Sequence, residues 1–161
     1  MDVDTRKKLI DQYKDGYRAV SDALVGASDA ELDARPAPGK WSAREIVHHL
    51  GDSEMAAAFR LRLLLATDRP QIQGYDQEAF ARRLHYDRPY EASLDAFKAA
   101  RRTTAELLDA MTDADWARAG THSEMQGPYT CERWLEIYAP HAHNHATQIL
   151  VARDSARRRI G

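Results

Sequence analysis

The spacing of apolar residues is helical along nearly the whole chain, and this feature most constrains the fold. In the first segment, for example, Leu9, Tyr13, Tyr17, Val20 and Leu24 recur at steps of three or four residues. Stretches of alternating polar and apolar residues rich in Val, Ile and Thr, which predict strands, are missing. We therefore expect an all-α protein.

The helix boundaries are marked by capping residues and breakers. Ser28 and Ser42 each begin a capping box, Thr130 is placed to cap the last helix, and Gly26 ends the first. The unequal connections favour a four-helix bundle with at least one longer crossover, and a chain of 161 residues predicts one domain, residues 1–161. The expected long helices cover residues 4–25, 42–67, 89–111 and 130–156, with short helical turns after Ser28, within 75–86 and within 113–118.

Composition excludes several classes of protein. A net charge of −2 gives no electrostatic reason to bind nucleic acid or an acidic membrane. The single cysteine, Cys131, rules out an intramolecular disulfide and a cysteine-based zinc site, which fits a reducing compartment. The amino terminus lacks the apolar stretch of an export signal, and no apolar run approaches the roughly 20 residues that span a bilayer. We expect a cytoplasmic protein.

Three of the seven histidines are predicted to face the interior of the bundle. His141 and His145 are four residues apart on the apolar stripe of the last helix, so both imidazoles project from one face. His49 borders the apolar stripe of the second long helix. His48 and His143 fall on other faces, and we expect His143 to be exposed to solvent.

Three imidazoles suit a transition-metal cation. An i, i+4 pair of histidines can reach one ion, and a third ligand from a facing helix leaves a coordination position free, as in catalytic zinc sites. Nitrogen ligands also accept Ni, Fe(II) or Co. No glutamate follows His141, so the zinc-protease mechanism is not encoded. Pro140, directly before His141, would kink this helix. The alternative is that the histidines only pack in the core or pair at the surface.

Two sequence motifs resemble those of the DinB/YfiT-like superfamily. They are Trp41-Ser-Ala-Arg-Glu-Ile-Val-His-His49-Leu-Gly-Asp52, preceded by Arg35-Pro-Ala-Pro-Gly39, and His141-x-x-x-His145-x-x-Gln148-Ile149. The resemblance implies a four-helix bundle of up-down-down-up topology, commonly a homodimer, with a divalent metal held by His49, His141 and His145. It also implies thiol-dependent S-transferases among the relatives, so it identifies a site better than a substrate.

The hypothesis that follows is a metal-dependent enzyme acting on a small electrophile. A bound Zn or Ni would activate water for hydrolysis, or a small thiol cosubstrate for S-transfer. No catalytic side chain is assigned; Asp52 and Glu45 are candidates to orient His49 from neighbouring turns. Cys131 is expected to be a passive buried residue. The alternative function is a non-catalytic, stress-related, metal-binding homodimer.

Overall fold

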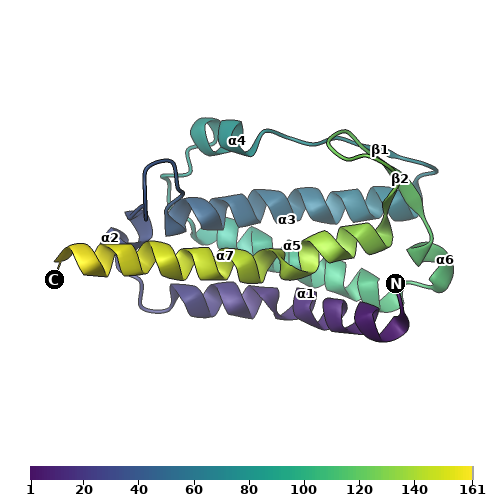
Figure 1. Cartoon of the computed structure of the whole chain (residues 1–161), viewed down its shortest axis with the longest axis horizontal. Coiled ribbons are helices and arrows are strands. Elements are labelled where there is room, and N and C mark those ends of the chain that lie inside the picture. The colour runs from purple at the N-terminus through teal and green to yellow at the C-terminus, as the bar shows by residue number, and fades with distance from the viewer. Residues whose placement is uncertain (161) are drawn as a thin grey trace.

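The computed structural model describes residues 1–160, and the side chains of residues 1–158. Within this range, four long helices carry the fold: α1 (Val3–Leu24), α3 (Ala43–Ala66), α5 (Glu91–Ala110) and α7 (Cys131–Ile160). α1 packs against α5 and α7, and α3 packs against the same two helices. Successive long helices run up, down, down and up (Figure 1). The predicted all-α four-helix bundle is confirmed.

The capping residues define the helix starts as expected. The Ser28 and Ser42 side chains accept hydrogen bonds from the amides of Glu31 and Glu45, and both reciprocal capping-box bonds are present. Ser28 begins the short helix α2 (Asp29–Asp33). Thr130 Oγ1 accepts from the amide of Arg133 at 2.9 Å, so it caps the first turn of α7.

The two longer connections contain both of the short helices that were expected there, together with strands that the sequence did not indicate. The crossover between α3 and α5 carries β1 (Gln71–Ile72) and α4 (Gln77–Arg83), and the connection between α5 and α7 carries α6 (Asp113–Trp116), β2 (Ala119–His122) and β3 (Tyr129–Thr130). β1 pairs in parallel with β2, and β2 pairs antiparallel with β3. The expectation of no strands was therefore wrong in detail, because strands of two to four residues are too short to show an alternating pattern.

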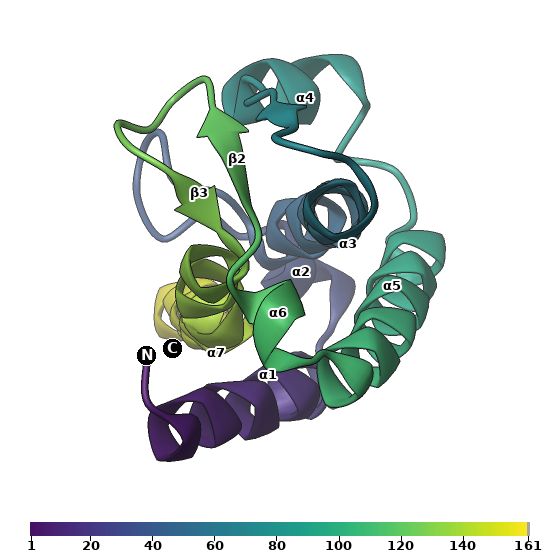
Figure 2. The same cartoon turned by 90° about the vertical axis from the view of Figure 1, so that its right-hand side faces the viewer.

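The small sheet and α4 form a layer over one side of the bundle. Figure 2, which looks along the bundle, shows this layer above α3 and α7 and away from α1. The crossover returns the chain to the end where α3 began, so that α5 runs parallel to α3. The two helices beneath this layer, α3 and α7, carry the three histidines that were predicted to face inward.

The apolar core is divided by a polar layer. One cluster, around Trp134 and Leu61, occupies one end of the bundle, and a second, around Phe97 and Ile46, occupies the other. Along α3, the last residue of the Phe97 cluster is Leu50, and the first residue of the Trp134 cluster is Ala57. The intervening turns of the long helices carry charged, hydroxyl and imidazole groups, so the polar layer lies at mid-bundle.

A buried ion pair dominates this polar layer. Arg101 and Glu54 are 2% and 1% exposed, and Nη2 of Arg101 lies 2.8 Å from Oε2 of Glu54. Arg101 Nη1 donates to the carbonyl of Tyr13 at 2.7 Å, and the Tyr13 hydroxyl donates to Glu54. A Cβ on Gly16 would overlap with Nη1 of Arg101, so only glycine allows this close approach. Arg101 occupies a position on the apolar stripe of α5. A charged residue at such a position indicates a buried partner of opposite charge, because an unpaired buried charge is strongly destabilising.

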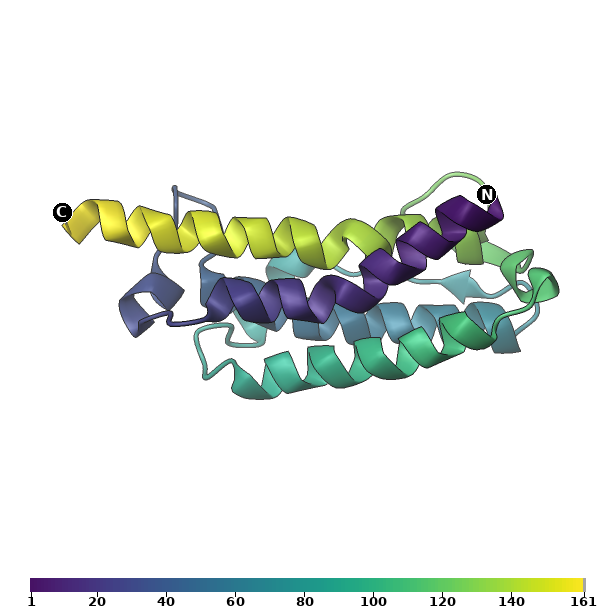
Figure 3. The ribbon, with the colours of Figure 1, turned by 90° about the horizontal axis from the view of Figure 1, so that it is seen from below.

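Helix α7 is continuous although it contains Pro140. Its axis bends in the first third of its length (Figures 1 and 3), and α1 runs alongside it in the same direction. A proline removes one backbone donor, which accounts for a bend without ending the helix. In the part of the chain that is described, no helix is long and apolar enough to cross a membrane.

Candidate metal centre

The three predicted histidines meet between α3 and α7. The ring centroid of His49 lies 5.5 Å from that of His141 and 4.8 Å from that of His145. Ligand nitrogens of the three imidazoles all lie within 4.8 Å of one another. His49 is fully buried, and the other two are partly buried. The helix periodicity therefore predicted the grouping of these residues across two helices that are far apart in sequence.

The two histidines of α7 point the same ring nitrogen at a shared space. Nε2 of His141 and Nε2 of His145 are 3.2 Å apart. Two nitrogens bound to one tetrahedral zinc ion at about 2.0–2.1 Å would be separated by about 3.3 Å. Gln148 Oε1 accepts a hydrogen bond from Nδ1 of His145 at 2.9 Å, which leaves the lone pair of His145 on Nε2.

All three imidazoles are kept neutral, which is the form that binds metals. Burial lowers the pKa of His49 to about 3, with a further contribution from the nearby His145. Burial also lowers the pKa of His141 well below its usual value, and the pKa of His145 is lowered by burial as well. Desolvation disfavours the charged imidazolium in each case.

Two ring nitrogens of the cluster are buried without a hydrogen-bond partner in the described part of the chain. Nδ1 of His49 and Nδ1 of His141 are buried and have no hydrogen-bond partner among the described residues. A cation bound to Nε2 of His141 would not satisfy Nδ1 on the other side of the same ring, so the fit of the cluster to a metal rests on the convergence of its imidazoles. Neutral nitrogens on three converging imidazoles fit a divalent transition-metal cation with at least one coordination position left open.

Aromatic rings pack against the imidazoles. The Trp41 ring lies 4.8 Å from that of His49, and the Tyr138 ring lies 5.8 Å from that of His141. The Tyr138 hydroxyl accepts a hydrogen bond from Arg60 at 2.9 Å. These contacts restrict the rotation of His49 and His141, which lack the direct hydrogen bond that orients His145.

The remaining histidines have other roles. His48 is buried, and its ring nitrogens lie 2.7 Å from Ser93 Oγ and 3.0 Å from the carbonyl of Arg88, so it joins α3 to α5 and the segment before it. His143 was expected to be exposed, but its side chain is only 30% exposed and Nε2 lies 3.0 Å from Oδ2 of Asp15 on α1. The face of α7 opposite the cluster is covered by α1, which accounts for this difference.

The two carboxylates predicted to orient His49 are engaged elsewhere. Glu45 accepts from the amide of Ser42 at 2.8 Å and pairs with Arg35. Asp52 accepts a hydrogen bond from the Tyr86 hydroxyl at 2.6 Å. Since Nδ1 of His49 has no partner within the described chain, neither carboxylate orients it directly, and this part of the prediction was wrong. A capping box uses its carboxylate at the helix start, so Glu45 could not also reach one turn onward.

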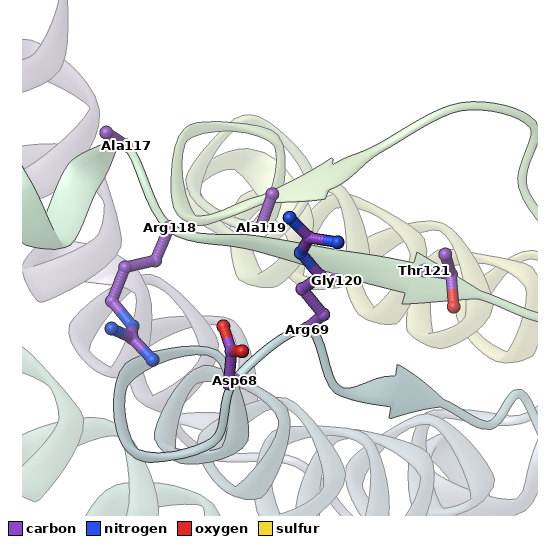
Figure 4. Close-up of a pocket in the computed structure, with 7 residues that line it drawn as sticks. All are labelled: Asp68, Arg69, Ala117, Arg118, Ala119, Gly120 and Thr121. Carbon is purple, nitrogen blue, oxygen red and sulfur yellow. The ribbon is translucent and has the colours of Figure 1, made fainter.

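Two further features lie outside the cluster. Cys131 is completely buried, and burial raises the pKa of its thiol to about 11, as expected of a passive residue. A hollow of about 420 Å³ at the end of α3 is lined by residues 68–69 and 117–121 and contains no histidine (Figure 4). There Arg118 donates to the carbonyls of Leu64 and Thr67, at 2.7 and 2.9 Å, and so caps the end of α3.

Comparisons with known proteins agree with this architecture. A sequence model of the DinB superfamily matches residues 12–149. An Oceanobacillus iheyensis protein named "Putative metal-dependent hydrolase" is 30% identical over 140 residues, which cover 87% of this chain and 81% of the relative. "Putative metal-dependent hydrolase YfiT" of Bacillus subtilis is 28% identical over 146 residues, 89% of this chain and 82% of the relative.

A solved structure shares the whole fold. The structure of Bacillus subtilis YfiT, called "a probable metal-dependent hydrolase with an unusual four-helix bundle topology", superposes with a TM-score of 0.87 at 26% sequence identity. The match covers 100% of this chain and 90% of that protein. The arrangement of helices that brings the three histidines together is therefore shared with this protein.

Proposed function

This chain belongs to the DinB superfamily, and from that membership and the geometry of the cluster we propose that it is a metal-dependent hydrolase whose cation is held by His49, His141 and His145. The observation that carries the proposal is the convergence of three neutral imidazoles, with two Nε2 atoms 3.2 Å apart. The relatives named as metal-dependent hydrolases support the reaction class.

A divalent cation bound there would supply Lewis-acid activation of water and polarisation of a substrate carbonyl. The residues of the chain prepare the site for it. Gln148 keeps the proton of His145 on Nδ1, and Trp41 and Tyr138 pack against the other two rings. An all-nitrogen donor set favours Zn or Ni over Mg or Ca, which prefer oxygen. Hydrolysis of an ester by this site would consume one water and release a carboxylic acid and an alcohol.

Thiol S-transfer is the second candidate because it needs the same open coordination position with a different nucleophile. The structure limits the source of sulfur, since Cys131 is buried and its thiol has a pKa of about 11. A cosubstrate thiol would have to supply the nucleophile. The expected homodimer stays a prediction, which sedimentation of the purified protein would test.

Turnover by the metal-loaded protein tests the proposal. Protein purified without a histidine tag and loaded with Zn or Ni is offered a panel of esters, amides and alkylating electrophiles, with and without small thiols. We expect thiol-independent hydrolysis that disappears in His145→Ala. Activity only with a thiol would establish the S-transferase instead, and inactivity with one bound metal per chain would favour the non-catalytic metal-binding protein.

A further inference from the structure

A cavity of about 590 Å³ adjoins the metal centre. Two of the residues that line it are His145 and its hydrogen-bond partner Gln148, so the cavity reaches the histidine cluster itself. Its size lies within the range of about 300–1,000 Å³ that small-molecule sites occupy. The rest of the lining comes from the connection before α3, the first turn of α3, α4 and the later part of α7, and includes Lys40, Trp41, Ile46, Glu78 and Val151.

The walls of the cavity are mainly apolar. Trp41 forms one wall while its ring also contacts His49 at 4.8 Å between centroids, so it borders both the cavity and the metal centre. Ile46, one turn before His49, is 2% exposed. Val151 on α7 is 54% exposed. An apolar group bound in the cavity would remove this surface from water.

The charges of the cavity argue against phosphorylated or dianionic substrates. Lys40 and Glu78 contribute one charge of each sign, and within the described part of the chain neither forms an ion pair. Among the described residues that line the cavity, none is an arginine. Sites for phosphate use arginine, clustered lysines or the amides of a helix amino terminus. The helices α3 and α4, which both contribute to the lining, carry carboxylates in their first turns instead: Glu45 closes the capping box of α3, and Glu78 lies in the first turn of α4.

We propose that this cavity is the substrate chamber and that it takes an uncharged carboxylic ester or amide with an apolar body. The apolar body lies against Trp41, Ile46 and Val151, and the acyl carbonyl is directed toward the histidine cluster. The proposal rests on the proposed function for its choice of reacting group. The apolar preference of the chamber is independent of it, and the two can be tested separately.

Hydroxamates provide the first test because they bind metals through one end. Acetohydroxamate has no apolar body, whereas 4-phenylbutanohydroxamate carries the same chelating group on a phenylpropyl body. With zinc-loaded protein, we expect calorimetry to give a Kd at least about 30-fold lower for the phenyl compound. Equal affinities would overturn the proposal, and so would tighter binding of the analogue in which phosphonate replaces phenyl.

Two neighbouring residues supply a matched pair of variants. Val151 and Leu150 are 54% and 53% exposed, but only Val151 lines the cavity. In Val151→Lys the affinity ratio of the two hydroxamates should fall below about 5-fold, and in Leu150→Lys it should keep its wild-type value. Equal loss of the ratio in both variants would show a general surface effect and would overturn the assignment.

The chamber can also be tested without a metal. Binding of 4-phenylbutanamide to zinc-free protein, followed by tryptophan fluorescence, should be weakened in Val151→Lys and kept in Leu150→Lys. If the amide binds in this pattern but acetohydroxamate shows no zinc-dependent binding, the apolar chamber is supported and the proposed function is contradicted. No binding of the amide by zinc-free wild-type protein, with no gain from the phenyl group in the zinc-loaded form, would overturn the chamber.

Discussion

Gln148 accepts a hydrogen bond from Nδ1 of His145 at 2.9 Å, across one turn of α7. This bond selects the tautomer of His145 whose Nε2 lone pair faces Nε2 of His141, 3.2 Å away. His49 and His141 have no such partner among the described residues. Gln148 therefore fixes the position of the proton on His145, and the packing of α3 against α7 brings His49 close to the other two histidines.

Replacing this glutamine should weaken metal binding without abolishing it. In Gln148→Leu, Nδ1 of His145 loses its acceptor, so the imidazole can rotate and change tautomer. We expect zinc affinity to fall about 10- to 100-fold, the usual effect of removing a hydrogen-bond partner of a metal-bound histidine. Competition with a chromophoric zinc chelator measures it. Thr147→Val is the control. The Thr147 hydroxyl donates to the carbonyl of His143 and contacts none of the three imidazoles through a hydrogen bond, so this substitution should leave the zinc affinity unchanged.

The metal-free protein should lose stability as the pH falls below about 6.5. The pKa of His49 drops from its usual 6.5 to about 3 in the folded state, so below 6.5 the unfolded chain binds a proton that the folded chain does not. Stability that is full above 6.5 is then lost progressively toward pH 3. A single imidazole with the folded-state pKa of His49 removes about 2 kcal/mol between pH 6.5 and 5.

Urea unfolding of chelator-treated protein at several pH values checks this prediction. The free energy of unfolding should decrease less steeply between pH 6.5 and 5 in His49→Asn than in the wild type, because one of the titrating groups is gone. Identical slopes for the two proteins would show that His49 does not resist protonation in the folded state.

The buried pair between Arg101 and Glu54 should be costly to break from one side. Arg101→Met leaves the Glu54 carboxylate, which is 1% exposed, without its cation, and we expect a loss of about 3–5 kcal/mol in unfolding free energy. The double variant Glu54→Leu/Arg101→Met removes both charges and should be more stable than Arg101→Met alone. Thermal and chemical unfolding of the wild type and both variants measure this, and equal destabilisation in both variants would contradict it.

Much of the fold follows from local signals in the sequence. Helix spacing and the capping residues Ser28, Ser42 and Thr130 predict the long helices closely; the first, expected over residues 4–25, is Val3–Leu24. The same spacing predicts that His49, His141 and His145 face inward. Such signals act within one or two turns of helix, where sequence distance and spatial distance agree.

The features missed by sequence reasoning depend on contacts between distant segments. β1 pairs with β2 through Gln71 and Thr121, and neither short strand has a pattern of its own. Glu45 and Asp52 were placed one turn from His49 along the helix, but their partners are Arg35 and Tyr86 from other segments. Arg101 gave a usable signal as a charged residue on an apolar stripe, although the identity of Glu54 as its partner requires the packed bundle.

The metal content of protein purified without a histidine tag tests the central claim most directly. We predict one divalent ion per chain in the wild type and in the control His143→Ala, whose histidine pairs with Asp15 outside the cluster. His49→Ala, verified as folded by circular dichroism, should retain none under the same dialysis. Full metal content in His49→Ala, or its absence from the folded wild type, would contradict the assignment of His49, His141 and His145 as the metal site.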